Sequence, residues 1–127
     1  MIIGVGIDVV ETSRIARALA RYGDRFEARV FTRRELLACG GRVDRIQSLA
    51  ARFAGKEACL KALGTGWVKG LSLKHVEILK GDSGSPEIQL SGGAAERARE
   101  RGVARLHVSL SHEREYAAAV VVLERGP

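Results

Sequence analysis

QSLAARFAGKEACLKALG, residues 47–64, is the stretch that decides the fold of this chain. Alanine and leucine dominate it, proline is absent and a glycine ends it, so we predict a helix over 47–64 with Gly64 as its stop signal. At about 100° per residue, the apolar side chains gather on one side of this helix. They are Ile46, Leu49, Ala50, Phe53 and Leu60, with Gly64 in line with them.

The same side of the predicted helix carries two charges, Glu57 and, one turn later, Lys61. Burying an ionised carboxylate without a partner is costly, so such groups are paired, bound to a metal or set in a polar cleft. Two interpretations are therefore open: an internal ion pair at i, i+4 on a partly wet face, or a functional site. A second face holds only small residues, which predicts close approach of another backbone. That face consists of Ala51, Ala54, Gly55, Ala58 and Ala62.

Length and composition indicate one globular domain over residues 1–127, with 46% hydrophobic and 28% charged residues. No apolar run approaches the roughly 20 residues of a membrane-spanning helix, and the N-terminus lacks the basic region of a signal peptide. Cys39 and Cys59 do not make a disulfide framework, so we expect reduced thiols in a cytoplasmic protein. The net charge of +6 favours an acidic partner or an anionic substrate, without separating nucleic acid from acidic protein.

Residues 3–9 alternate bulky aliphatic side chains with Gly4, Gly6 and Asp8. This pattern predicts a strand with one bulky face and one nearly bare face. Asp8 lies near the end of the strand, on the face that the glycines leave clear. A carboxylate presented there is typical of a metal or phosphate site; the alternative is that Asp8 caps the helix that follows.

That next helix is predicted to begin around Glu11 to Ser13, with Thr12 or Ser13 as its N-cap. Its buried side is assigned to Ile15, Leu19 and Tyr22. Arginines recur along it at intervals of three or four residues, so we expect them to share one face. They are Arg14, Arg17, Arg21 and Arg25. Because the run has nearly one sign of charge, it favours a docking surface for an acidic partner over a solvated face without a role.

The remaining elements are short. Thr32–Glu35 has the pattern of a capping box at the start of a helix that Gly40-Gly41 ends. Strands are predicted over 71–80, 87–90, 105–111 and 116–123, and a helix over 94–101. The strand over 116–123 is continuously apolar, which places it in the middle of a sheet. The glycine-rich loop over 65–70 is a weak signal for an anion nearby.

Asp8 and Glu57 are two carboxylates on different elements, and Lys61 lies one turn beyond Glu57. Mg²⁺ typically takes one or two carboxylates together with waters and substrate phosphates, and a lysine can hold a phosphate oxygen. This arrangement points to metal-assisted phosphoryl transfer. The sequence holds neither a GxxxxGK[ST] loop nor a GxSxG elbow, which argues against P-loop nucleotide binding and serine hydrolysis.

Three segments carry a resemblance to a known family: GIDVVE at 6–11, FAGKEACLKALG at 53–64, and SLSH at 109–112 shortly before YAAA at 116–119. In this order and spacing they closely resemble the holo-acyl-carrier-protein synthases, the short bacterial class of 4′-phosphopantetheinyl transferases. Gly55 stands where that family usually has alanine. The resemblance implies an α+β fold in which an antiparallel sheet packs against a long central helix, and a homotrimer with active sites between subunits.

The resemblance also implies a reaction: transfer of 4′-phosphopantetheine from coenzyme A to a serine of an acidic apo acyl carrier protein, with release of adenosine 3′,5′-bisphosphate. Asp8 and Glu57 match the Mg²⁺ ligands of the family, and Lys61 matches the lysine that stabilises the leaving phosphate. Lys56 is expected to contact phosphate. The base is left open between Glu57 and a metal-bound water.

Further roles follow from the same resemblance. Ser111 and His112 are expected to shape the coenzyme pocket, in part from an adjoining subunit. Arg14 and its helical neighbours match the surface on which the family docks its carrier protein. The rival interpretation is a non-catalytic basic module that binds acidic carrier proteins or nucleic acid. It explains the net charge but not the combination of Asp8, Glu57 and Lys61, and the chain has only six aromatic residues for base stacking.

Overall fold

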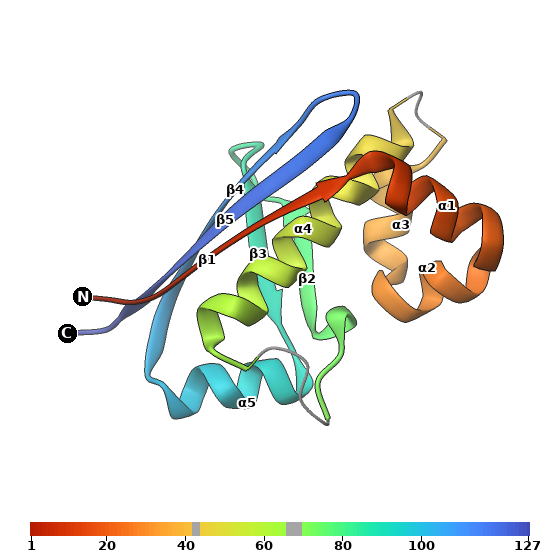
Figure 1. Cartoon of the computed structure of the whole chain (residues 1–127). Helices are drawn as coiled ribbons and strands as arrows, with labels where there is room; N and C mark the ends of the chain where they lie inside the picture. The colour runs from red at the N-terminus through yellow and green to blue at the C-terminus, as the bar shows by residue number, and fades with distance from the viewer. Residues whose placement is uncertain (42–43, 66–69) are drawn as a thin grey trace.

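The computed structural model describes residues 1–41, 44–65 and 70–127, and has the expected α+β class with antiparallel sheets. One sheet has the strand order β1-β5-β4, and a second sheet is the hairpin of β2 and β3. The strands are β1 Ile2–Glu11, β2 Val76–Lys80, β3 Pro86–Leu90, β4 Val103–His112 and β5 Tyr116–Arg125. The helices are α1 Thr12–Tyr22, α2 Asp24–Val30, α3 Arg33–Cys39, α4 Arg45–Leu63 and α5 Gly92–Glu100, with a 3₁₀ turn, η1, at Leu73–His75. In Figure 1, α1, α2 and α3 gather near one end of α4, and α5 lies near its other end.

Helix α4 runs from Arg45 to Leu63, and Gly64 ends it in a left-handed conformation with φ 76°. The predicted helix and its stop signal are therefore confirmed, with a start two residues earlier. The single apolar stripe was too narrow an expectation, because every residue from Ser48 to Lys56 is buried. The helix packs on β1 and β5 on one side and meets β2, α1 and α3 on others. Its small side chains let all of these neighbours come close.

The contact between β1 and α4 is the tightest of these. A Cβ added to Gly6 would lie 2.8 Å from the backbone nitrogen of Ala62, and nearer still to the carbonyl of Ala58. A Cβ on Gly4 would overlap the carbonyl of Ala62. The prediction of an open, bare face around Asp8 is thus wrong: α4 occupies that face. The predicted close approach of a backbone to the small side of the helix is confirmed.

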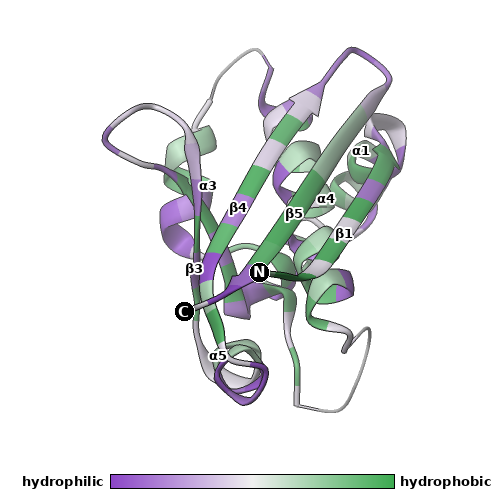
Figure 2. Ribbon diagram, turned by 90° about the vertical axis from the view of Figure 1, so that its left-hand side faces the viewer, coloured by the Kyte–Doolittle hydropathy of each residue, from purple (hydrophilic) through white to green (hydrophobic). Residues whose placement is uncertain are grey.

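The bulky face of β1 points the other way. Val5, Ile7 and Val9 have exposed fractions of 59%, 63% and 59%. In Figure 2, β4, β5 and β1 face the viewer with α4 behind them, and β5 in particular is hydrophobic over most of its length. Strand β5 lies between its two partners, as its continuous apolar sequence predicted. The three-stranded sheet is therefore covered by α4 on one face and apolar yet exposed along β1 on the other.

Several local predictions need correction. The N-cap of α1 is Glu11 rather than Thr12 or Ser13, because the Thr12 hydroxyl donates to the carbonyl of Arg114 at 2.7 Å. Helix α1 ends at Tyr22 before Gly23, whose φ is 52°, so Arg25 belongs to α2 and does not share a helix face with the earlier arginines.

In the second half of the chain, the strand predicted over 71–80 begins only at Val76, because residues 73–75 form η1. Of the glycine-rich loop, residues 66–69 lie outside the described residues. The capping box of Thr32 and Glu35 is confirmed.

Neither cysteine forms a disulfide: Cys39 and Cys59 are free and buried. Burial raises the pKa of the Cys59 thiol to about 12, so it stays protonated. No helix in the described part of the chain is long and apolar enough to cross a membrane. The expected cytoplasmic location stays a prediction.

Candidate active site

Asp8, Glu57 and Lys61 lie together where the end of β1 meets the second half of α4. Asp8 has the same parity along β1 as Gly4 and Gly6, so it points toward the helix. The ammonium of Lys61 donates to Asp8 Oδ1 at 3.1 Å and to the carbonyl of Ile7 at 3.0 Å. The side chain of Asp8 is 17% exposed, whereas that of Lys61 is 54% exposed. Lys61 thus reaches the carboxylate from the solvent side.

Glu57 is half-buried beside this pair. Its pKa is raised above the ordinary value of a glutamate, first because burial removes water from the carboxylate and second because the negative charge of Asp8 is near. The positive charges of Arg14 and Lys61 oppose both effects. Among the ion pairs of the described residues, Lys61 is joined to Asp8 and not to Glu57. The interpretation as an internal Glu57–Lys61 ion pair is therefore not supported, and the two carboxylates repel each other.

Two carboxylates that repel each other across a half-exposed position are a donor set that fits a divalent cation with oxygen ligands. No cluster of three or more His, Cys, Asp or Glu side chains occurs within residues 1–41, 44–65 and 70–127. A closed site built wholly from protein ligands, as for structural zinc, is thus not present in these ranges. Asp8 and Glu57 would instead hold Mg²⁺ with most of its coordination left to water and substrate oxygens.

Lys56 does not belong to this site. Its side chain is 0% exposed, and its ammonium donates to Glu35 Oε1 at 2.7 Å, to the carbonyl of Val76 at 2.5 Å and to the carbonyl of Leu73 at 3.1 Å. All three of its N–H donors are therefore used inside the protein. Burial lowers the pKa of Lys56, and the adjacent Glu35 carboxylate opposes that shift. The prediction that Lys56 contacts a phosphate is wrong in this structure.

The arginines of α1 border the carboxylate site. The guanidinium of Arg14 lies 5.5 Å from the centre of the Phe53 ring, one helical turn before Glu57 on α4. Arg17 and Arg21 are exposed further along α1 and line an open groove of about 530 Å³ with Tyr22. Basic charge therefore extends from the carboxylates along α1.

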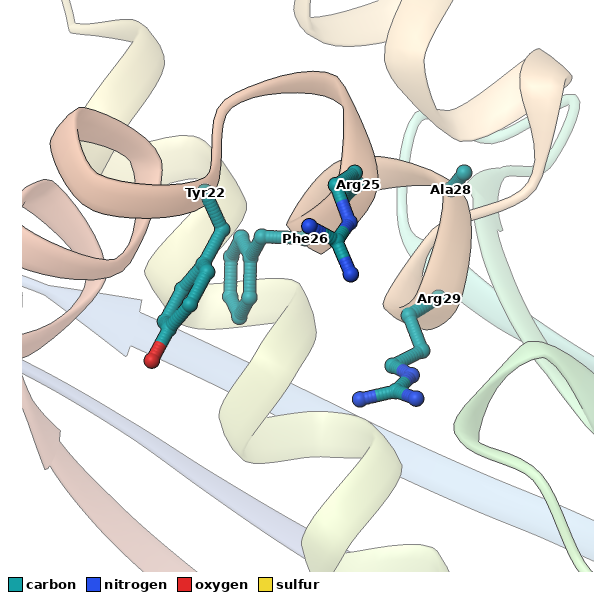
Figure 3. Close-up of a pocket in the computed structure, with 5 residues that line it drawn as sticks. All are labelled: Tyr22, Arg25, Phe26, Ala28 and Arg29. Atoms are coloured by element: carbon teal, nitrogen blue, oxygen red, sulfur yellow. The ribbon is translucent and has the colours of Figure 1, made fainter.

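A second groove of about 570 Å³ continues this surface onto α2. Figure 3 shows Tyr22 and Phe26 side by side in it, with Arg25 and Arg29 next to them. Tyr22 is 50% exposed, so its assignment to the buried side of α1 was wrong. Sequence reasoning missed Phe26 as a part of this surface. The only signal for Phe26 was its position within the basic run.

Ser111 and His112, at the end of β4, are not next to Asp8 in this chain. Ser111 pairs with Ala118, which pairs with Val9, so Ser111 points to the outer face of the sheet, away from α4. His112 points to the opposite side and lines a pocket of about 210 Å³.

Two basic residues line the same pocket as His112, namely Arg52 and Lys80. Arg52 is buried, and its guanidinium donates to the carbonyl of Ile78 at 3.1 Å and to the Ser48 hydroxyl at 2.7 Å. No local pattern distinguishes Arg52, since it lies among small and apolar residues in a helix.

Comparison with known proteins shows the family to which the chain belongs. Residues 4–121 match the family model of the 4′-phosphopantetheinyl transferase superfamily, and the chain belongs to that superfamily. The holo-[acyl-carrier-protein] synthase of Maridesulfovibrio salexigens is 46% identical over 125 residues, which cover 98% of this chain and 100% of the relative.

Solved structures of holo-[acyl-carrier-protein] synthases have the same fold as this chain. The holo-[acyl-carrier-protein] synthase from Neisseria meningitidis superposes with a TM-score of 0.88 at 36% identity, covering 98% of this chain and all of the other. The Helicobacter pylori synthase, solved in complex with coenzyme A, superposes with a TM-score of 0.83 at 36% identity, covering 94% and 99%. The family resemblance of the sequence is thereby confirmed, and with it the expectation of an enzyme, of the holo-[acyl-carrier-protein] synthase class.

Proposed function

We propose that this chain transfers the 4′-phosphopantetheine group of coenzyme A to a serine hydroxyl of an apo acyl carrier protein and releases adenosine 3′,5′-bisphosphate. The observation that carries the proposal is the meeting of Asp8, Glu57 and Lys61 beside the basic surface of α1, in a chain of this family. The alternative of a non-catalytic basic module is not favoured, because such a module has no use for two repelling carboxylates next to a lysine.

In this proposal Asp8 and Glu57 hold Mg²⁺, which supplies positive charge to the pyrophosphate of coenzyme A. The serine oxygen of the carrier forms the new bond to the phosphorus that bears pantetheine, and the bond from that phosphorus to the bridging oxygen breaks. Lys61, half-exposed and able to leave Asp8, stabilises the phosphate that departs. The proton of the serine hydroxyl would pass to the Glu57 carboxylate or to a water beside it.

The carrier protein is proposed to dock on α1 and α2. Arg14, Arg17, Arg21 and Arg25 supply positive charge for an acidic partner, and Tyr22 and Phe26 supply an apolar floor between them. Because Arg14 is the arginine whose charge acts on Glu57, docking along α1 would bring the carrier serine toward the carboxylates. Arg25 takes part from α2 rather than from the face of α1.

The coenzyme is proposed to occupy the pocket of His112, whose basic lining suits a phosphorylated nucleoside. In one chain this pocket lies across α4 from the carboxylates, since Ser48 and Arg52 are about 140–180° around the helix from Glu57. A coenzyme in that pocket would therefore reach the carboxylates of a neighbouring copy more readily than those of its own chain. Ser111, on the outer face, would likewise contribute to a site shared between copies.

The exposed apolar face of β1 supports assembly of the chain into a homotrimer. Soluble monomers rarely expose contiguous apolar patches of this kind, and homo-oligomers with closed symmetry are the usual way to cover them. Sedimentation equilibrium tests this part of the proposal. A particle of three times the 13.7 kDa chain mass is expected, and a monomer at micromolar concentration would contradict it.

One incubation tests the reaction itself. The chain is mixed with coenzyme A, Mg²⁺ and an apo acyl carrier protein, and the carrier is weighed by mass spectrometry. The expected result is a gain of one phosphopantetheine per carrier, lost when the acceptor serine is replaced by alanine. No gain with several apo carriers would refute the proposed function. Retention of the carrier on the chain without any gain would point to the non-catalytic alternative.

A further inference from the structure

The ion pair of Glu35 and Lys56 is the one fully buried pair of opposite charges within the described ranges, and the proposed reaction does not use it. Both side chains are 0% exposed. Glu35 Oε1 accepts from Lys56 and from the backbone nitrogen of Thr32 at 2.9 Å, and Glu35 Oε2 accepts from the backbone nitrogen of Ile78 at 2.8 Å. No buried side-chain donor or acceptor of the described residues lacks a partner. The network is thus complete and directional.

Four elements meet at this pair. Glu35 comes from α3 and Lys56 from α4, while the acceptors of the ammonium are the carbonyls of Leu73 in η1 and Val76 in β2. Helix α4 carries Glu57 as the next residue, and β2 continues into the pocket of Arg52 and His112. The pair therefore joins the helix that presents the carboxylate to the hairpin that lines the pocket.

Stability alone does not account for the pair. Replacing a buried ion pair with apolar residues of similar volume is often neutral or stabilising, because both charges must lose their water. Orientation gives a better reason. Helix α4 is buried on nearly every side, and five of its fourteen buried residues are alanine and one is glycine. Apolar packing on these small faces distinguishes poorly between slightly rotated positions of the helix. Directional hydrogen bonds from Lys56 select one of them.

We propose that Glu35 and Lys56 are positioning residues, which fix the rotation of α4 so that Glu57 faces Asp8. This inference rests on the proposed function for its kinetic consequence, although not for its structural one. A rotation of α4 that moves a carboxylate by about 1 Å is enough to lower a transfer rate by about a hundredfold, since the reacting groups must be held in alignment.

The test uses the double variant Glu35→Gln/Lys56→Met, which removes both charges and nearly keeps both shapes. Its kcat for phosphopantetheine transfer is expected to fall by about tenfold or more, with KM for coenzyme A and carrier within about threefold. In ¹H–¹⁵N spectra, the backbone amides of Asp8, Glu57 and Lys61 are expected to shift. The matched control is Leu49→Ala, a fully buried residue of the same helix outside the network. It lowers the Tm and leaves kcat and those three amides near their wild-type values.

A folded double variant with wild-type kcat, or with the three amides unmoved, overturns the inference. If the double variant does not fold, the same kcat and amide measurements are made on Glu35→Gln alone. This variant keeps one acceptor for Lys56 and removes the acceptor of the Ile78 nitrogen. If the wild-type chain transfers no phosphopantetheine, the proposed function fails, and the amide shifts alone decide whether the pair positions α4.

Discussion

Replacing Gly6 with alanine tests whether the close packing of β1 on α4 creates the active site. The added Cβ would lie 1.9 Å from the carbonyl oxygen of Ala58, whereas ordinary contact begins near 3.4 Å. The atoms that the Cβ meets are backbone atoms of α4, so no side chain can rotate to make room for it. The strand and the helix must therefore separate locally by about 1.5 Å. Asp8 lies two residues further along the same face of β1, so it moves away from Glu57 and Lys61.

The expected result for Gly6→Ala is a loss of about a hundredfold in kcat for phosphopantetheine transfer and a loss of about 1–3 kcal/mol in stability from overpacking. Transfer is followed by the mass of the carrier, and stability by urea unfolding. Gly41→Ala is the matched control, because a Cβ there meets nothing within 4 Å and no positive φ is recorded for Gly41. A Gly6→Ala protein with kcat within threefold of wild type would refute the claim that this contact positions Asp8.

Three further predictions address the charges of the site. Asp8→Ala and Glu57→Ala should each lower transfer by about a thousandfold while the fold stays intact by circular dichroism, because the cation contributes several kcal/mol; near-normal rates at limiting Mg²⁺ would contradict the metal assignment. Arg14→Glu should raise KM for the acidic carrier by about tenfold at low salt and by less at high salt, because salt screens exposed charges; an unchanged KM removes Arg14 from the docking surface. Glu57→Gln should raise the Tm at neutral pH in the presence of a chelator but not near pH 3.5. The pKa of Glu57 is raised above 4.5 in the folded chain, so ionising this carboxylate costs stability. The wild type therefore loses stability as pH rises from 4.5 through the raised pKa. Equal Tm values of the variant and the wild type at neutral pH would contradict this cost.

Much of the backbone could be predicted, because local patterns determine it. Composition and the terminal glycine predicted the helix over 47–64, and the unbroken apolar run of β5 predicted its central place in the sheet. The capping box of Thr32 and Glu35 needs only residues three apart. By contrast, Gly23 separates α1 from α2 within a run whose arginine spacing continues across it, so periodicity alone wrongly extended one helix face to Arg25.

The residues of the candidate site fall into the same two groups, those that a local pattern reveals and those whose partners are distant in the sequence. Asp8, Glu57 and Lys61 could be selected because a charge in an apolar or bare pattern stands out along the chain. Lys56 could not be placed, because its adjacent glutamate suggested a shared role, whereas a helix turns about 100° between the two residues. Its true partner, Glu35, is 21 residues away on another helix. Arg52 was missed for the same reason: the carbonyl of Ile78 becomes its neighbour only after α4 packs on β2, although its other partner, Ser48, lies one turn earlier on the same helix.

The two glycines of β1 connect these observations. Their sequence pattern suggested room for a ligand, but the room is taken by the backbone of α4, and the bulky residues between them are turned outward. One strand therefore performs two tasks with alternate residues. Its glycine side brings a carboxylate against a helix that carries another carboxylate, and its exposed aliphatic side is the face on which a further copy of the chain is proposed to bind. A substitution on either side of β1 should thus affect the proposed reaction, through the position of Asp8 in one case and through the proposed pocket between copies in the other.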